Sequence, residues 1–269
     1  MIPSAPLAGK TALVTGGARR IGRSIALALA QAGADVAISY RSSQSGAAQT
    51  VAEIAALGRR SVATHCDVRN EASVRCAVAS VAAEFGRLDI LVNNAAVFAS
   101  AALESLSINQ WDEVFETNAR GPFLVAREAL PHLRAAHGRI VNIGSLGGFH
   151  AWAGHAHYCA SKAAVHMLTQ AMAKAFAPEV SVNCVAPGWI EIASSASEGV
   201  PTLSSASAEK RVGGEAARLA AQAAHFASKT PMGRNGSAED VAEAVLFFAT
   251  GPHFITGQIL AVDGGLGLS

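Results

Sequence analysis

The sequence lacks the features that mark several large classes of protein. Its four cysteines, Cys66, Cys76, Cys159 and Cys184, are scattered and form no C-x-x-C pair. Such spacing is typical of reduced, buried thiols in a cytosolic protein and fits neither a disulfide framework nor a zinc site. No uninterrupted apolar run reaches about eighteen residues, which argues against a transmembrane helix. The N-terminal residues show no basic region followed by an apolar core, so we expect no signal peptide and a cytoplasmic location.

Charge is also scarce, and neither sign dominates. The 269 residues include 21 Lys plus Arg and 20 Asp plus Glu, for a formal net charge of +1. A chain so close to neutral is not expected to bind nucleic acid or an anionic membrane surface as its main partner. With 51% hydrophobic residues and a mean hydropathy of +0.29, it has ample material for a folded core. We therefore expect a soluble cytoplasmic enzyme or binding protein.

Short apolar runs alternate with longer amphipathic segments along the whole chain. The apolar runs predict seven strands, at 11–15, 35–39, 61–66, 88–92, 139–143, 180–185 and 258–262. The amphipathic segments predict helices at 21–31, 47–57, 71–85, 109–136 (one helix, or two with a kink at Gly121-Pro122), 158–176 and 238–249. This alternation is typical of βαβ units. We predict a single α/β domain over 1–269, a doubly wound parallel sheet of the Rossmann type with helices on both faces.

One stretch departs from this rhythm. Residues 193–207 are rich in Ala and Ser, and a weak helix interrupted by Gly213-Gly214 follows as far as Ser228. A long connection beyond the carboxyl end of a strand is either disordered or functional. We interpret 193–230 as a lid over the substrate site.

A glycine-rich turn follows the first strand directly. The sequence T-G-G-A-R-R-I-G, from Thr15 to Gly22, leads into the first helix. Small residues at Gly16 and Gly22 let the backbone approach a pyrophosphate, and a helix N-terminus offers free N–H groups and a positive dipole end. Glycine-rich loops are also common as ordinary turns, so position after the first strand is what favours a dinucleotide site.

The end of the second strand indicates which dinucleotide. A site selective for NAD places an acid there to accept from the ribose 2′-hydroxyl. No Asp or Glu occurs between Asp35 and Glu53, and Tyr40, Arg41 and Ser42 stand in that place. An arginine flanked by hydroxyls suits a 2′-phosphate, to which Arg19 could add a second charge. We predict NADP(H); the alternative is a solvated polar loop.

Tyr158 and Lys162 lie four residues apart at the start of a predicted helix, so their side chains share one face. A phenol is a poor acid–base group at neutral pH, but a nearby ammonium lowers its pKa. Ser145, just beyond the fifth strand, could hold the same substrate oxygen. Taken alone, Y-x-x-x-K is frequent by chance and is usually a surface pair.

Across almost its whole length the sequence resembles the short-chain dehydrogenase/reductase family. The matching motifs occur in the family's order: T-G-G-A-R-R-I-G (15–22), C-D-V (66–68), N-N-A-A (93–96), T-N-A-R-G-P (117–122), I-G-S (143–145), Y-C-A-S-K (158–162), N-C-V-A-P-G (183–188) and V-D-G-G (262–265). The family's usual oligomer is a tetramer, built partly from helices like those predicted at 109–136 and 158–176. The resemblance implies a homo-oligomer here, a tetramer or a dimer.

The resemblance also implies a role for each matched position. Tyr158 would be the general acid in reduction, Ser145 would orient the substrate oxygen, and Lys162 would bond the nicotinamide ribose and lower the pKa of the tyrosine. Asn118 would hold a water that relays protons, and Asn93 would steady the fourth strand. The positions implied to contact NADP(H) are Gly16, Arg19, Arg20, Ile21, Gly22, Tyr40, Arg41, Ser42, Asp67, Val68, Asn94, Ala95, Tyr158, Lys162, Pro187, Gly188 and Ile190. Those expected to contact substrate are Phe98, Ser145, Tyr158 and Trp189.

Three departures qualify the resemblance: two from the common family pattern, at Arg20 and Ile192, and one from a branch of the family, at Ser145. Arg20 replaces the usual middle glycine of the turn, which resembles the pteridine reductase branch, and Phe98 matches the aromatic that stacks on the pterin there. Ser145, however, stands where the best-known members of that branch carry an aspartate. Ile192 occupies a position where the family commonly has a threonine that bonds the cofactor carboxamide, so that contact must come from elsewhere, with Ser194 and Ser195 as candidates.

We therefore expect an NADPH-dependent oxidoreductase acting on a small carbonyl or pterin-like substrate. Two alternatives remain: a 3-oxoacyl thioester reductase, and a protein that senses NADP(H) without turnover. The intact Ser145, Tyr158 and Lys162 favour catalysis. His150, His155 and His157 lie beside the tyrosine, but no carboxylate or thiolate is spaced to complete a metal site with them. We expect these histidines to line the mouth of the pocket and expect no metal.

Overall fold

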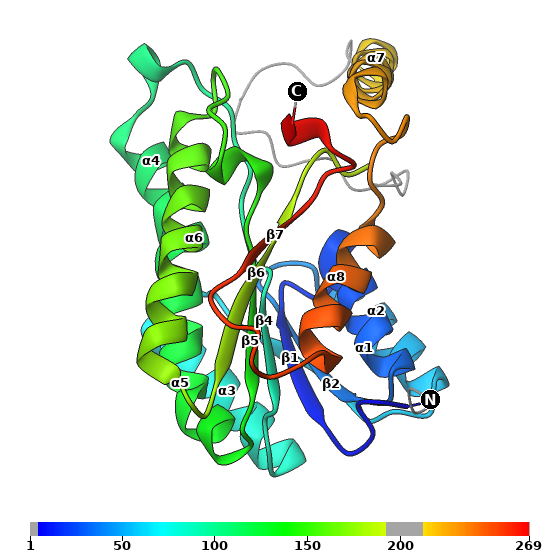
Figure 1. The fold of residues 1–269 in the computed structure, drawn as a ribbon, viewed down its shortest axis with the longest axis vertical. Coiled ribbons are helices and arrows are strands. Elements are labelled where there is room, and N and C mark those ends of the chain that lie inside the picture. The colour runs from blue at the N-terminus through cyan, green and yellow to red at the C-terminus, as the bar shows by residue number, and fades with distance from the viewer. Residues whose placement is uncertain (1–4, 192–211, 269) are drawn as a thin grey trace.

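The fold is built on one sheet of seven parallel strands. The computed structural model describes residues 5–191 and 212–268, with the backbone alone over 212–219. Across the sheet the strands follow the order β3-β2-β1-β4-β5-β6-β7 (Figure 1). Their bounds are β1 (Thr11–Thr15), β2 (Asp35–Tyr40), β3 (Ser61–His65), β4 (Ile90–Asn93), β5 (Arg139–Ile143), β6 (Ser181–Pro187) and β7 (Ile259–Val262). The predicted doubly wound α/β fold is confirmed.

The strand order reverses between β1 and β4. The chain moves outward from β1 through β2 to β3, then returns to pair β4 with the other side of β1 and continues to β7. In such sheets ligands bind at this reversal, outside the carboxyl ends of the strands. The fold therefore places the glycine-rich turn, which leaves β1, beside the segment that leaves β4.

Helices cover both faces of the sheet. One face carries α1 (Arg20–Gln31), α2 (Gln44–Ala56) and α8 (Ala238–Thr250); the other carries α3 (Glu71–Phe85), α4 (Ile108–Phe115), α5 (Gly121–Ala135) and α6 (Ala156–Phe176) (Figure 1). Alternate residues of β1 and β2 belong to two separate cores, since Val14 and Ile38 pack with the first group and Leu13 and Ala37 with the second. Both faces of the sheet are buried at the central strands β1, β4, β5 and β6, which explains their largely apolar sequences.

Helix α3 shows why some boundaries are legible in the sequence. The side chain of Asn70 caps its N-terminus by accepting from Ser73 N at 2.9 Å, and Gly86 ends it with a left-handed φ of 74°. Polar caps and a glycine in that conformation are the usual signals of helix ends. The predicted helix at 71–85 accordingly coincides with the observed one.

The segment predicted as one or two helices at 109–136 contains a local irregularity. Between α4 and α5 the chain makes a π-helical turn over Glu116–Arg120, immediately before Gly121. Widened turns of this kind occur frequently at functional sites. This one carries Asn118, whose side chain is buried.

The carboxyl-terminal part of the predicted lid is helical. Helix α7 (Val212–Lys229) starts just before Gly213 and Gly214, so these glycines lie in its first turn and do not interrupt it. The rest of the lid prediction, at 193–211, and Ile192 lie outside the described residues. Within the described ranges, no helix is both long and apolar enough to cross a membrane. All four cysteines are free, but Cys76 is exposed, so the prediction that all are buried is wrong at that position.

Candidate active site

Thr15, the last residue of β1, ties the glycine-rich turn to the segment after β4. Its hydroxyl accepts from the backbone N–H groups of Asn94 and Ala95 at 2.9 and 3.0 Å. The Asn94 side chain returns the contact, donating to the carbonyls of Thr15 and Gly16 at 2.9 and 3.1 Å. These four hydrogen bonds thus fix the two segments at the strand reversal to each other.

The turn itself leaves space that only glycine permits. Gly16 has a φ of +65°, and a Cβ on Gly22 would lie 2.3 Å from the carbonyl oxygen of Gly16. Helix α1 begins at Arg20, which has a φ of 52°, and its first turn has no side-chain cap and no acidic residue. An uncapped helix N-terminus free of carboxylates is the setting in which backbone N–H groups bind a phosphate.

No Asp or Glu directly follows β2. Tyr40 is half-buried at the strand end, and Arg41 and Ser42 are exposed after it. Beside them the hydroxyl of Ser43 is buried and, in the described part of the chain, has no hydrogen-bond partner, although Ser43 precedes α2. A buried hydroxyl without a partner is costly and is expected to bind a ligand or water. Sequence reasoning missed Ser43, and only its position next to Ser42 could have drawn attention to it.

Asp67, which follows β3, is already paired. Its carboxylate accepts from Arg69, with the Arg69 Nη2 to Asp67 Oδ2 distance at 2.7 Å. The hydrogen bond from Arg69 holds the pKa of Asp67 below its usual value despite partial burial. An adenine contact by this carboxylate, which the family resemblance implies, would therefore share oxygens with Arg69. Val68 is buried beside Gly121, where a Cβ would lie 2.9 Å from its side chain.

The predicted catalytic residues come together at the ends of β5 and α6. Lys162 donates to the carbonyl oxygen of Ile143 at 2.8 Å, and its ammonium lies 5.8 Å from the centre of the Tyr158 ring. The Ser145 hydroxyl accepts from Gly147 N at 3.1 Å and also hydrogen-bonds with Tyr158. The structure thus brings serine, tyrosine and lysine into one cluster.

The pKa of Tyr158 is raised in this cluster, whereas the sequence predicted that Lys162 would lower it. Burial raises the pKa of Tyr158 to about 12, although the hydrogen bond with Ser145 opposes the rise. Burial also lowers the pKa of Lys162 to about 8. Because the ammonium is directed at the Ile143 carbonyl, a lowering of the tyrosine pKa by Lys162 is not shown by this geometry and stays a prediction.

Asn118 is buried in the π-helical turn and binds the segment after β4. Its Oδ1 accepts from Val97 N at 2.8 Å, and its Nδ2 donates to Val97 O at 2.9 Å and to Ser161 Oγ at 3.1 Å. These three hydrogen bonds fix the backbone immediately before Phe98 to α6, the helix that carries Tyr158. The role implied by resemblance, holding a relay water, stays a prediction.

Aromatic rings surround the phenol. Phe98 meets Tyr158 edge to face with ring centres 4.8 Å apart, and Trp152 stacks nearly parallel to it at 6.2 Å. Phe98 also stacks on His155 at 4.8 Å, yet 49% of its surface stays exposed. An exposed ring beside the phenol is available to a substrate, so Phe98 remains a candidate contact.

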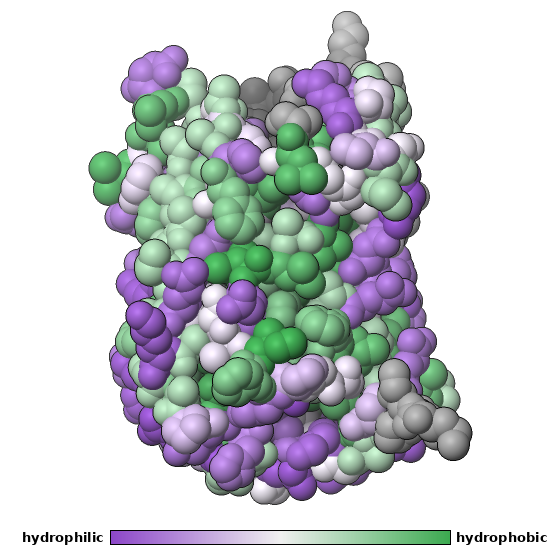
Figure 2. All heavy atoms as spheres, in the orientation of Figure 1, coloured by the Kyte–Doolittle hydropathy of each residue, from purple (hydrophilic) through white to green (hydrophobic). Residues whose placement is uncertain are grey.

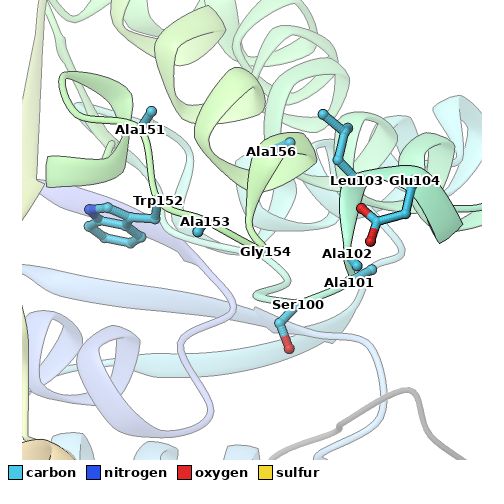
Figure 3. Close-up of a pocket in the computed structure, with 10 residues that line it drawn as sticks. All are labelled: Ser100, Ala101, Ala102, Leu103, Glu104, Ala151, Trp152, Ala153, Gly154 and Ala156. Atoms are coloured by element: carbon cyan, nitrogen blue, oxygen red, sulfur yellow. The ribbon is translucent and has the colours of Figure 1, made fainter.

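A pocket of about 600 Å³ opens next to these rings (Figure 3). It lies between residues 100–104, which follow β4, and residues 151–156, which lead into α6. Apart from Trp152, Leu103 and Glu104 its lining consists of small residues: Ser100, Ala101, Ala102, Ala151, Ala153, Gly154 and Ala156. The pocket is therefore mainly apolar, with a single carboxylate at its edge.

The histidines near the tyrosine do not all line the pocket mouth. His157 is fully buried, and neither ring nitrogen has a partner among the described residues, so that part of the prediction is wrong. His155 instead packs on Phe98. Within the described ranges no group of three or more His, Cys, Asp or Glu side chains is placed to hold a metal ion.

The end of β6 and the segment after it contain three of the predicted cofactor contacts and pack against the segment after β7. A Cβ on Gly188 would lie 2.7 Å from the Cβ of Asp263, so the motifs that end β6 and follow β7 pack closely. Pro187 ends β6, and Ile190 forms a bridge with Gly236. Trp189 stacks on Phe226 of α7 with ring centres 4.3 Å apart. Trp189 thus anchors α7, and its predicted contact with substrate is untested.

Comparison with known proteins decides the family. The sequence profile of a family described as enoyl-(acyl carrier protein) reductase matches residues 16–267. The 3-oxoacyl-[acyl-carrier-protein] reductase FabG of Staphylococcus aureus is 36% identical over 260 residues, covering 96% of this chain and 98% of the relative. The chain belongs to the short-chain dehydrogenase/reductase family.

Solved structures of proteins with similar sequences share the fold. A dehydrogenase/reductase from Sinorhizobium meliloti 1021 matches with a TM-score of 0.84 and 35% identity, covering 99% of this chain and 98% of that one. A blue fluorescent protein from a metagenomic library, solved in complex with NADPH, matches with a TM-score of 0.82 and 33% identity, covering 97% and 99% of the two chains. The resemblance noted in the sequence is confirmed at the level of the family.

Proposed function

We propose that this short-chain dehydrogenase/reductase reduces a carbonyl compound with NADPH, with Tyr158 as the proton donor. The observation on which the proposal mainly rests is the cluster of Ser145, Tyr158 and Lys162 at the sheet edge where the uncapped start of α1 also lies. The names of the FabG relatives and the NADPH complex of a structural neighbour support the same assignment.

The residues at this edge fit NADP(H). The glycine turn and the first turn of α1 would bind the pyrophosphate through their backbone N–H groups. The glycines carry no side chain that would block the phosphate, and the first turn of α1 has no side-chain cap. Arg41, Ser42 and the hydroxyl of Ser43, which has no partner among the described residues, would bind the 2′-phosphate. No Asp or Glu directly follows β2, and the nearby Asp67 carboxylate is already paired with Arg69. NADPH, when bound there, supplies the hydride.

The chain's own contribution is to place and hold a proton. A phenol with a pKa of about 12 keeps its proton at neutral pH, so Tyr158 is ready to donate to a carbonyl oxygen that is gaining negative charge. Ser145 would donate to the same oxygen and fix its direction. Lys162, still largely charged at pH 7, would favour the phenolate left after proton transfer.

The 3-oxoacyl thioester class is the second candidate substrate, favoured by the relatives' names. The pocket's small apolar lining accommodates an acyl group, and the exposed face of Phe98 could stack on a planar one, including a pterin. A pteridine reductase activity has no support from the compared proteins. Glu104 at the pocket edge disfavours strongly anionic substrates.

The test is consumption of NADPH, with NADH in parallel, against a 3-oxoacyl thioester, a dihydropterin, a quinone and simple ketones. We expect turnover of at least one carbonyl compound and faster consumption of NADPH than of NADH. Tight NADPH binding without turnover of any carbonyl would contradict the proposal and favour a cofactor-sensing protein.

We further propose that the protein is a cytoplasmic homo-oligomer, a tetramer or a dimer. Apolar residues gather over the face that β7 and α8 present (Figure 2). Phe247, Phe254 and Leu260 are exposed there, with Phe254 at 99%, and Phe123 and Met167 are exposed on α5 and α6. Exposed apolar surface of this extent is typical of protein interfaces. The free cysteines agree with a reducing compartment.

A further inference from the structure

His166 is buried one helical turn beyond Lys162, on the same face of α6, and the function proposed above gives it no role. Only 7% of its surface is exposed. The Phe149 ring packs against its imidazole with ring centres 4.5 Å apart. Its Nε2 has no hydrogen-bond partner among the described residues, so a polar contact through that nitrogen does not explain its position.

The imidazole fills space that two glycines leave open. A Cβ on Gly148 would lie 2.4, 2.8 and 2.9 Å from Cε1, Nδ1 and Nε2 of His166, which are its three nearest atoms. A Cβ on Gly144 would lie 2.5 Å from His166 Nε2 and 2.7 Å from Cys184 Sγ. Contacts that short do not occur, so the ring could not sit there if either residue carried a side chain.

Backbone conformation does not require these glycines. Neither Gly144 nor Gly148 has a positive φ, and an L-amino acid could adopt either conformation without strain. The three atoms nearest to a Cβ on Gly148 all belong to the His166 ring, so the methyl group of an alanine there would clash first with His166.

The segment between the two glycines contains Ser145. Its hydroxyl accepts from Gly147 N at 3.1 Å, and its carbonyl accepts from Gly148 N at 2.9 Å. Any displacement of Gly148 by the ring therefore reaches Ser145 through one hydrogen-bonded turn. The other end of the segment follows Ile143, whose carbonyl accepts from Lys162.

We propose that His166 is a positioning residue, whose imidazole presses on the turn between Gly144 and Gly148 and so sets the place of the Ser145 hydroxyl relative to Tyr158. This inference rests on the proposed function of Ser145. An effect on rate is expected because a hydrogen-bond donor acts only within narrow limits of distance. Displacing such a group by about 1 Å can lower the reaction rate about 100-fold.

The test is a double-mutant cycle of Gly148→Ala and His166→Ala, measuring kcat, KM and the NADPH Kd for the reaction found in the substrate panel. Gly148→Ala alone should lower kcat about tenfold or more, because the new methyl meets the ring and shifts the turn. In the His166→Ala background the same change should cost less than about threefold, because the ring is gone. The NADPH Kd should stay within about twofold in all variants, because none of the residues expected to contact NADP(H) lies in the turn between Gly144 and Gly148.

Val78→Ala is the matched control. Val78 is buried in α3 within the core on which α5 packs, away from the Ser145 turn, so its truncation should lower stability without changing kcat. Full kcat in Gly148→Ala, or an equal loss in both backgrounds, would overturn the proposal. If Gly148→Ala fails to fold, His166→Ala alone decides: a loss of kcat at unchanged NADPH Kd supports the role, and full kcat refutes it. A wild-type chain that reduces no carbonyl would instead refute the proposed function.

Discussion

Two arginines near the proposed cofactor site differ in whether a carboxylate binds them directly. Arg69 is bound by the carboxylate of Asp67, whereas Arg41 is exposed at the end of β2 and contributes to lowering the pKa of the same carboxyl. Arg41 has no direct carboxylate pair among the described residues, and such an arginine can turn to a phosphate at little cost. Arg41 is therefore the residue on which discrimination between NADPH and NADH should depend most.

Replacement of Arg41 by alanine tests this at the scale of one side chain. We expect the Kd for NADPH to rise about 10- to 100-fold, the range expected when a charge-assisted hydrogen bond of about 1.5–3 kcal/mol is lost. The Kd for NADH should change by less than about twofold. Fluorescence titration with each cofactor measures both values.

Arg75→Ala is a suitable comparison, because Arg75 is a similarly exposed arginine paired with Glu71 on α3. It should leave both cofactor affinities unchanged. A parallel loss of NADPH and NADH affinity in Arg41→Ala would show that the arginine does not bind the 2′-phosphate.

The sequence predicts the role of a single residue where a local pattern, such as a helical spacing, indicates the chemistry. The i, i+4 relation of Tyr158 and Lys162 and the absence of an acid after β2 are visible in the sequence. Ser43 and His166 were not predictable, because a lone serine or histidine forms no sequence pattern. Ser43 stands out only because its buried hydroxyl has no partner among the described residues. His166 stands out only because its ring fills space left by Gly144 and Gly148. The direction of the Lys162 ammonium toward Ile143 likewise depends on packing.

At the scale of elements, the start of β4 is fixed by a buried carboxylate. Asp89 accepts from Arg87 and Lys10 and from the backbone N–H of Thr11 at 2.9 Å, so it joins the beginning of β4 to the beginning of β1. Burial alone would raise the pKa of Asp89, but the hydrogen bonds from Arg87, Thr11 and Lys10 together hold it below its usual value.

Asp89→Asn should therefore lower the free energy of unfolding at pH 7 by about 1–3 kcal/mol. Because the folded pKa is depressed, the stabilisation by Asp89 is present above the unfolded value of 3.8 and is lost as pH falls through the folded value. Urea denaturation from pH 7 down to pH 3 measures it, and the difference between wild type and variant should shrink toward the acid end.

Asp112→Asn, at an exposed carboxylate, should show no such difference at any pH. Equal stability of Asp89→Asn and wild type at pH 7 would show that the ion pairs at the start of β4 contribute nothing net.

Element boundaries were predictable where local signals fix them. Asn70 and Gly86 bound α3, and β1 and β5 match their predicted limits. The π-helical turn within 109–136 was not predictable, since it accommodates contacts of Asn118 with Val97 and Ser161, which come from other segments.

At the scale of the whole molecule, the sheet order explains how motifs spread along the chain form one site. The segments after β1, β2, β3, β4, β5 and β6 each contribute a predicted site residue, and all leave the sheet at its carboxyl edge. This convergence follows from the predicted strand–helix alternation. Substrate choice does not follow from it, because it depends on loops such as 100–104 and 151–156, whose shape no periodicity encodes.

Tyr158→Phe tests most directly whether Tyr158 donates the proton. It removes one oxygen from a half-buried ring and leaves the packing of that ring on Phe98 and Trp152 in place. NADPH binding by fluorescence titration and NADPH consumption with the best carbonyl substrate are measured on the same preparation. The NADPH Kd should stay within about threefold of wild type, and kcat should fall by about 100-fold or more. A variant that binds NADPH normally and retains a substantial fraction of wild-type kcat would contradict the assignment of Tyr158 as the proton donor.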